Sequence, residues 1–121
     1  MIKSFLDLEV YSESLQLAKE INFLLRSFPK DEVYLLVDQA KRASRAIPSL
    51  IAEGWAKRRQ VREFQKYLRD AMGESNEMMN HLKQAEAFGH LEAKKAKDLI
   101  ERYDRLSAKL SKLKDTWQNF S

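Results

Sequence analysis

Apolar residues recur every three or four positions along four separate stretches of the chain, with polar residues between them. A β-strand repeats every two residues, so this spacing predicts helices. Its mean of about 3.5 residues is typical of helices in a left-handed bundle. The four seams are Val10, Ser14, Leu17, Ile21, Leu24 and Phe28; Val33, Leu36, Ala40, Ala43, Ile47, Leu50 and Gly54; Val61, Phe64, Leu68, Ala71, Ser75, Met78, Leu82 and Ala85; Ala96, Leu99, Tyr103, Leu106, Leu110, Leu113, Trp117 and Phe120.

The first two predicted helices meet at a proline. We expect the first helix to run from near Leu6 to about Ser27, because Pro29 cannot continue it and biases the preceding residue toward extended backbone. Asp31 follows two residues later, and an aspartate at this position is typical of a helix N-cap. We therefore predict that Asp31 caps the second helix.

The other boundaries are set by proline and glycine. The second helix should reach Gly54 with a kink at Pro48 but no break, because its seam stays in phase across the proline. A third helix over 61–88 should end at Gly89, and a fourth should span 93–117. The short connections indicate an all-α, up-down-up-down, left-handed four-helix bundle.

Length and composition agree with this fold. The chain has 121 residues, enough for a single domain over 1–121, and only 3 Gly and 2 Pro. The lack of cysteine excludes a disulfide framework, a thiol nucleophile and cysteine-ligated zinc. No apolar run approaches the roughly 18 residues that span a bilayer, and the first residues do not resemble a signal peptide. We expect no membrane partner and a cytoplasmic location.

Positive charge is concentrated in one part of the chain. The net charge is +4, but the segment 41–69 contains nine basic residues and two acidic ones, whereas the rest is mildly acidic. This imbalance favours a surface for a polyanion, RNA or DNA. The predicted nucleic-acid-binding residues are Lys41, Arg42, Arg45, Lys57, Arg58, Arg59, Arg62, Lys66 and Arg69.

Part of this basic set has helical spacing. From Arg58 to Arg69, four cations recur at intervals of 4, 4 and 3 residues and so share one face of a helix, where they can meet successive phosphates. The alternative is a solvated surface in which these cations pair with Glu63, Asp70 and Glu74 at helical spacings. The sequence leaves both interpretations open.

Some apolar residues lie off the seams. One interpretation is a wider core face, which globular helices commonly have. The other is a subunit interface, because contiguous apolar patches on small proteins mark contacts. The predicted interface residues are Tyr11, Leu15, Trp55, Met72 and Met79.

Candidate catalytic and metal chemistry is sparse. Glu74, Glu77 and His81 lie on neighbouring turns, but a di-iron bundle needs Glu-x-x-His on each of two helices. The chain also lacks a convergent Ser, His and acid set and a glycine-rich phosphate loop, so we expect no enzyme, no metal and no cofactor. We expect Glu53 to pair with a nearby cation, and Gly73 to allow close helix packing.

The stretch 46–54, Ala-Ile-Pro-Ser-Leu-Ile-Ala-Glu-Gly, closely resembles the signature of a family of small bacterial four-helix bundles, named for reading frames within intervening sequences of 23S rRNA genes. The resemblance extends over about 5–91 and leaves the fourth helix supported by pattern only. Further matching positions are 5–11, Phe28, Pro29, Gln39, Arg42, Ala43, Glu63, Phe64, Tyr67, Leu68, Ala71, Gly73 and Glu77.

Two positions depart from the family pattern: Leu50 stands where Asn is usual, and Glu74 where Ser is usual. If the usual residues contact a ligand, those contacts are lost here. The resemblance implies a bundle that commonly forms a homopentamer with a central channel and has no established enzymatic activity. Related bundles serve as accessory proteins of diversity-generating retroelements, where they bind nucleic acid and a reverse transcriptase.

We therefore expect a non-catalytic, oligomeric module, with a pentamer suspected, that binds RNA or a ribonucleoprotein partner through its basic surface. The alternative is a structural or protein-interaction oligomer without affinity for nucleic acid.

Overall fold

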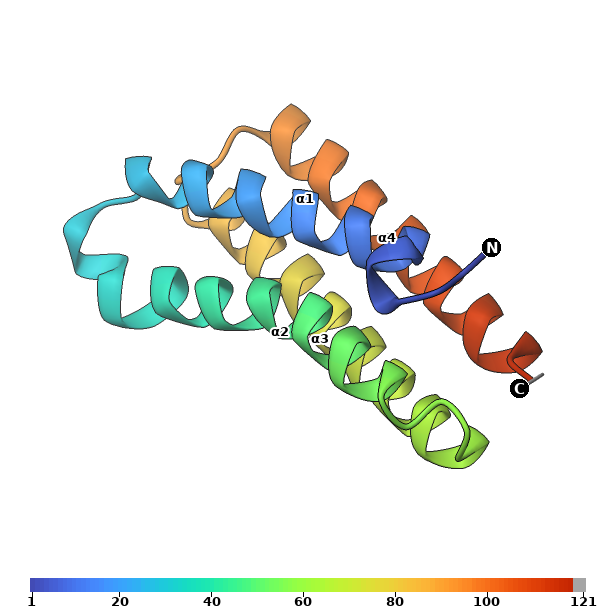
Figure 1. Ribbon diagram of the computed structural model, residues 1–121. Helices are drawn as coiled ribbons and strands as arrows, with labels where there is room; N and C mark the ends of the chain where they lie inside the picture. Colours follow the sequence, from blue (N-terminus) through green and yellow to red (C-terminus); the bar gives the residue numbers. More distant parts are fainter. Residues whose placement is uncertain (119–121) are drawn as a thin grey trace.

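The computed structural model describes residues 1–118, and within this part of the chain it contains four α-helices and no strand (Figure 1). The prediction of an all-α fold is confirmed. No helix among the described residues is long and apolar enough to cross a bilayer. The helices are α1 (Glu9–Leu24), α2 (Asp38–Trp55), α3 (Val61–Ala87) and α4 (Ala93–Thr116).

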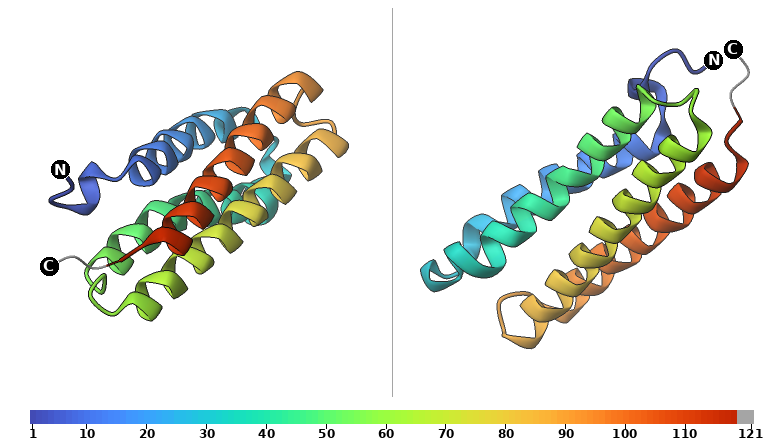
Figure 2. Two further views of the ribbon diagram at one scale, coloured as in Figure 1. Left: turned by 90° about the vertical axis from the view of Figure 1, so that its right-hand side faces the viewer. Right: turned by 90° about the horizontal axis from the view of Figure 1, so that it is seen from below.

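The helices lie lengthwise beside one another (Figure 2). α3 packs along both α2 and α4, and α1 packs along α2, whereas α1 and α4 touch each other much less. The three inner contacts therefore form the packed body of the protein, and the α1–α4 side is the loosely closed edge.

The predicted seams supply the core. Residues of all four helices form one buried cluster, and in the fourth seam every position from Ala96 to Leu110 is at most 1% exposed. Val33 is an exception because it is 42% exposed, and Phe120 lies outside the described residues. Burial of these apolar stripes is the main stabilising contribution to such a bundle.

Short 3₁₀ turns flank α1. The turn η1 (Phe5–Asp7) comes first, and α1 begins at Glu9, later than the predicted Leu6. After α1 the chain forms η2 (Leu25–Ser27) and then becomes extended at Phe28, with φ −74° and ψ 150°. The extended residue before Pro29 agrees with the steric effect of the proline ring.

The predicted N-cap at Asp31 is wrong. Asp31 lies in a 3₁₀ turn, η3 (Lys30–Glu32), which continues through a π-helical segment, η4 (Val33–Val37), into α2. The backbone is therefore already helical before α2 begins, and the preceding turn supplies acceptors for its first amides. No side chain caps α2.

α2 continues through the buried Pro48 without a break, as predicted, and ends at Trp55, one residue beyond Gly54. Gly54 is required by packing: a Cβ added to it would lie 2.6 Å from the Cβ of Tyr67 on α3. The backbones of α2 and α3 approach closely at this point.

The prediction that Gly73 allows close helix packing is wrong for contacts within this chain. Gly73 is exposed, and an added Cβ would meet no atom within 4 Å. The glycine in the middle of α3 is therefore not explained by contacts among the described residues.

Gly89 ends α3, as predicted. Its φ of 81° lies in the left-handed region, which glycine adopts without strain. The next amide, of His90, donates to the carbonyl of Ala85 at 2.8 Å, which is the closing bond of a helix C-cap. The imidazole Nε2 of His90 also lies 2.8 Å from Oε2 of Glu32, so this turn is tied to η3.

Candidate nucleic-acid interface

The nine predicted basic residues fall into two groups that lie apart. Lys41, Arg42 and Arg45 are near the start of α2, whereas the group from Lys57 to Arg69 lies at the α2–α3 connector and the start of α3. At 1.5 Å per residue, Lys41 and Lys57 are separated by about 24 Å along the helix axis. The basic segment is therefore not one patch.

In the first group, Arg42 is already occupied by two carboxylates. Its Nη1 lies 3.1 Å from Oε2 of Glu74, and its Nη2 lies 2.6 Å from Oε2 of Glu77. Arg45 donates to Oδ1 of Asn22 on α1 at 3.1 Å. Arg42 thus links α2 to α3, and Arg45 links α2 to α1.

The two carboxyl groups on Arg42 differ electrostatically. Burial raises the pKa of Glu74, and hydrogen bonding to Glu77 adds to this effect while Arg42 opposes it. The pKa of Glu77 is lowered by its hydrogen bond with Glu74 and by Arg42. Glu74 therefore accepts a proton more readily than Glu77.

His81 does not join these carboxylates in a metal site. Its side chain is buried, burial lowers its pKa, and neither ring nitrogen has a hydrogen-bond partner in the described part of the chain. Within residues 1–118, no group of three or more His, Cys, Asp and Glu side chains is arranged to hold a metal ion.

The second group is partly paired. Lys57 Nζ lies 3.4 Å from Oε2 of Glu63, and Lys66 Nζ lies 2.9 Å from Oδ2 of Asp70. These two lysines therefore have the ion-paired arrangement that the alternative interpretation predicted. Such exposed pairs are worth well under about 1 kcal/mol, and a phosphate can compete for them.

Arg58 has a structural contact of its own. Its guanidinium carbon lies 4.6 Å from the centroid of the Trp55 ring, and its Nη1 donates to the Trp55 carbonyl at 3.2 Å. The indole Nε1 of Trp117 donates to the Arg58 carbonyl at 2.9 Å. Arg58 therefore helps to tie the α2–α3 connector to the end of α4.

Trp55, predicted at an oligomer interface, lies in the core of its own chain instead. It is 8% exposed and packs edge-on against Phe64 and Trp117, with ring centroids 6.2 and 5.5 Å away. The sequence pattern missed this because Trp55 comes after the last seam residue of α2, and the aromatic ring of Trp117 reaches it only through the fold.

The other predicted interface residues lie nearer the surface. Leu15 is 48% exposed, and Tyr11 is half-buried with its ring 4.9 Å from that of Phe5. Met72 and Met79 are half-buried and pack against the core. Leu15 and Tyr11 also line a groove beside α1, with Leu6 and Ala18.

Five of the predicted cations keep exposed side chains with no carboxylate within 4.0 Å among the described residues: Lys41, Arg45, Arg59, Arg62 and Arg69. Three of them belong to the second group. We call the surface formed by Arg59, Arg62 and Arg69 the α2–α3 turn surface.

The predicted pairing of Glu53 is not found. No ion pair of Glu53 occurs within residues 1–118, since its expected partners contact other groups.

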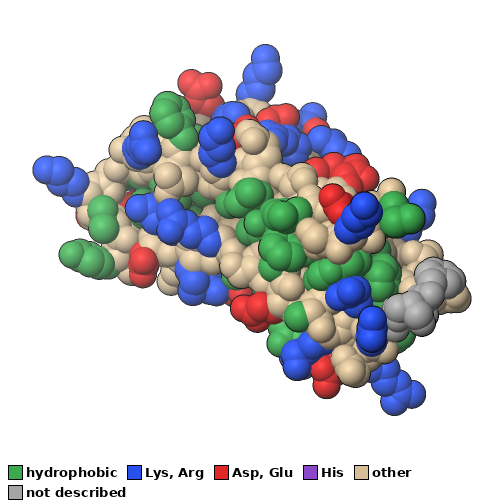
Figure 3. Space-filling view, viewed as in Figure 1, with side chains coloured by type: hydrophobic (Ala, Val, Ile, Leu, Met, Phe, Trp, Pro, Cys, Tyr) green, Lys and Arg blue, Asp and Glu red, His purple; other side chains and the backbone are tan. Residues whose placement is uncertain are grey.

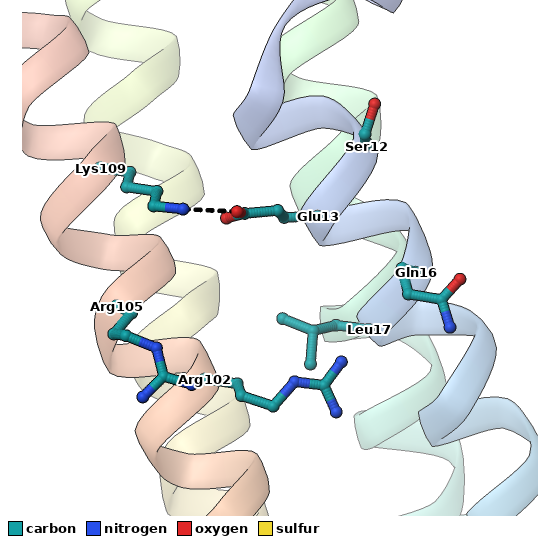
Figure 4. Close-up of a pocket in the computed structure, with 7 residues that line it drawn as sticks. All are labelled: Ser12, Glu13, Gln16, Leu17, Arg102, Arg105 and Lys109. Carbon is teal, nitrogen blue, oxygen red and sulfur yellow. Dashed lines mark hydrogen bonds and ion pairs between the residues drawn. The ribbon is translucent and has the colours of Figure 1, made fainter.

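A second basic region was missed by the sequence analysis. Between α1 and α4 the surface is hollowed, and one hollow is lined by Glu13, Leu17, Arg102, Arg105 and Lys109 (Figure 4). A second hollow continues beyond Gln16, which lines both. We call the two hollows together the α1–α4 groove.

Ion pairs cross this groove. Lys109 lies 2.6 Å from Glu9 and 2.5 Å from Glu13, and Arg102 Nη1 lies 2.8 Å from Oε1 of Glu20. The Arg102 guanidinium, whose other nitrogen also reaches Glu20, lowers the pKa of Glu20 to about 2. Charge pairs thus partly replace the apolar packing that joins the other helices.

These features define a small all-α protein with two cationic surfaces on a four-helix scaffold. The sequence matches the family model described as 23S rRNA-intervening sequence protein over residues 6–112, so the chain belongs to that family. The match continues into α4, beyond the part in which the sequence resemblance was recognised. Among curated proteins, none matches the sequence.

Proposed function

We propose that this protein is a non-catalytic, homo-oligomeric module that binds RNA or a ribonucleoprotein partner through the α2–α3 turn surface. The observation that carries the proposal is the set of three exposed arginines, Arg59, Arg62 and Arg69, that have no carboxylate partner among the described residues. Two further cations, Lys57 and Lys66, flank them in weak ion pairs.

This surface suits phosphate rather than bases. Guanidinium groups donate paired hydrogen bonds to phosphate oxygens, and neutralising each phosphate releases counterions. Exposed aromatic rings are lacking in this cluster, because Trp55 and Phe64 are buried and Trp117 is half-buried. Binding is therefore expected to read backbone and shape, as in proteins that recognise structured RNA.

The proposal includes the finer architecture and the assembly. Bonds between α2 and α3, from Arg42 to Glu77, and between α3 and α4, from Gln65 to the Lys114 carbonyl, fit consecutive antiparallel helices in a left-handed, up-down-up-down bundle. An apolar surface over η1 and α1 supports assembly of several copies, and we propose five, as the family resemblance implies. Figure 3 shows apolar side chains gathered along this face, with Lys and Arg around them.

The apolar surface is formed by residues of η1 and α1. Leu6 is 62% exposed and Leu15 48% exposed, and both line the groove that Tyr11 and Ala18 also line. Contiguous exposed apolar area on a small protein favours a contact with another chain. A structural or protein-interaction oligomer without RNA affinity is the second candidate function, and this surface is the observation that favours it.

Fluorescence anisotropy with a labelled RNA hairpin, across a salt series, tests the proposal. Changing Arg59, Arg62 and Arg69 together to Ala should weaken binding at least tenfold and reduce the slope of log affinity against log salt by about three. The matched control changes Lys94, Lys97 and Lys112 to Ala, which removes the same charge from α4. Absence of binding at low salt would favour the interaction oligomer, whereas equal loss in both triple variants would show that binding depends on overall charge and not on the α2–α3 turn surface.

A further inference from the structure

The α1–α4 groove combines cations with an exposed aromatic ring. Its second hollow is lined by Lys19, Phe23 and Leu24 of α1, by Arg26 of η2 and by Lys95 of α4. Lys19, Phe23 and Arg26 are four and three residues apart, which places them on one face of α1 and its continuation. The side chains come from two segments that are about seventy residues apart in the sequence.

The hollow carries an excess of positive charge. Among the described residues that line it, Glu20 alone is acidic, and Arg102 engages both oxygens of that carboxylate. Lys95 adds only a longer-range attraction to Glu20. Lys19, Arg26 and Lys95 have no carboxylate within 4.0 Å among residues 1–118, so their charges remain open to an anionic ligand.

Phe23 gives this hollow a feature that the α2–α3 turn surface lacks. The Phe23 side chain is 72% exposed, although a phenylalanine is normally buried. The guanidinium carbon of Arg26 lies over one face of the ring, 5.5 Å from its centroid, so a base would stack on the opposite face. An accessible ring flanked by cations matches the stacking platforms of proteins that bind single strands.

We infer that the α1–α4 groove binds single-stranded RNA, with one base stacked on Phe23 and neighbouring phosphates held by Lys19, Arg26 and Lys95. Arg105, exposed in the adjoining hollow, extends the positive track along α4. The inference rests on the proposed function in so far as RNA is the ligand, but it uses a different surface. Binding in the groove requires RNA bases whose faces are free to stack on Phe23, whereas binding at the α2–α3 turn surface requires only phosphates.

Anisotropy with a labelled ten-nucleotide oligoadenylate tests the stacking contact. An abasic strand of the same length serves as the comparison ligand. The wild-type protein should bind the oligoadenylate roughly tenfold more tightly than the abasic strand, because stacking on an aromatic ring is worth that factor or more. Phe23→Leu should remove this difference, and Phe23→Tyr should keep it. Thermal melts followed by circular dichroism verify that each variant is folded.

Matched controls separate this site from general charge and exposure. Tyr34 is 89% exposed and does not line the groove, so Tyr34→Leu should leave oligoadenylate binding unchanged. Lys19→Ala with Lys95→Ala should weaken binding of both strands several-fold. The paired control, Lys97→Ala with Lys112→Ala, should have a smaller effect because neither lysine lines the groove.

The outcomes distinguish this inference from the proposed function. Hairpin binding that depends on Arg59, Arg62 and Arg69, without affinity for oligoadenylate, overturns the inference and leaves the proposed function in place. Phe23-dependent oligoadenylate binding that survives the triple arginine change supports the inference and moves the RNA site to the groove. Equal binding of Phe23→Leu and wild-type protein overturns the inference.

Discussion

The α2–α3 turn surface and the α1–α4 groove are both cationic, but they are built in opposite ways. At the turn, the basic residues are consecutive or nearly so, and several of them are engaged by Glu63, Asp70 and Trp55. In the groove, the cations come from distant segments of the chain, and Lys19 and Lys95 have no carboxylate partner within residues 1–118.

This difference shows that charge density along a sequence is a poor measure of charge available to a ligand. A helix places neighbouring opposite charges within reach of each other, so a basic run with interspersed acids neutralises itself in part. At the loosely packed edge between α1 and α4, Arg102 and Lys109 are paired with carboxylates of α1, but Lys19, Arg26 and Lys95 have no carboxylate within 4.0 Å among residues 1–118. The packed turn and the open groove therefore respond differently to substitution.

The largest expected effect concerns the packing of the turn. Trp117→Ala should lower the free energy of unfolding by about 3 kcal/mol, because it removes a large aromatic packed 5.0 Å from the ring of Phe64 and a hydrogen bond to the Arg58 carbonyl. Urea unfolding measures the change. Phe23→Ala, at the exposed aromatic of the groove, should change it by less than about 0.5 kcal/mol. Equal losses of stability in the two variants would contradict the difference between the packed turn and the open groove.

A second effect tests the close approach of α2 and α3. Gly54→Ala should destabilise the protein by about 2 kcal/mol, because the new Cβ would lie 2.6 Å from that of Tyr67 and α3 must shift. Gly73→Ala, with nothing within 4 Å, should stabilise it by up to about 1 kcal/mol through helix propensity. The two melting temperatures should move in opposite directions, and a shift of the same sign would refute the assignment.

A third effect, about 1 kcal/mol, concerns the charge pair that closes the groove. Glu20→Gln removes the contact with Arg102 and should destabilise the protein at pH 7 by that amount. The folded-state pKa of Glu20 is lowered to about 2 from 4.5, so its contribution is complete above pH 4.5 and disappears as the pH falls toward 2. Unfolding of both proteins at pH 7 and near pH 3 checks this. If the two proteins differ in stability by the same amount at both pH values, the contact between Glu20 and Arg102 is not the source of the difference.

The smallest effect on stability belongs to the three free arginines. Changing Arg59, Arg62 and Arg69 to Ala should alter the free energy of unfolding by less than about 0.5 kcal/mol, since no ion pair within residues 1–118 depends on them. Arg58→Ala should cost about 1 kcal/mol, because that guanidinium lies over Trp55 and bonds its carbonyl. Guanidinium chloride melts compare the two, and comparable losses would show that the free arginines also have structural roles.

Much of the fold was predictable because it depends on local chemistry. Periodic apolar positions locate the faces that are buried, Gly89 marks the end of α3, and the phase of the seam across Pro48 shows that α2 continues. The failed N-cap at Asp31 shows the limit of this reasoning, because a cap residue is needed only where the preceding backbone is not already helical.

The candidate sites were predictable only in part. Arg59, Arg62 and Arg69 are exposed as expected, but Arg58 packs on Trp55, and Arg42 is occupied by Glu74 and Glu77. The groove did not stand out in the sequence, because its cations are divided between two segments that are distant along the chain. The sequence offered one hint of the groove, a phenylalanine (Phe23) that lies outside the apolar seam of the first helix.

The sequence by itself determined the four helices and their buried faces, since hydrophobic period, proline and glycine act through neighbouring residues. It also determined the family, through the run of residues around Pro48. Only the tertiary structure decided which charges are free and which aromatic rings are covered. Those outcomes depend on side chains brought together from distant segments, such as Trp117 with Arg58 and Lys95 with Phe23. No local pattern encodes such pairings, because they follow from how the four helices pack.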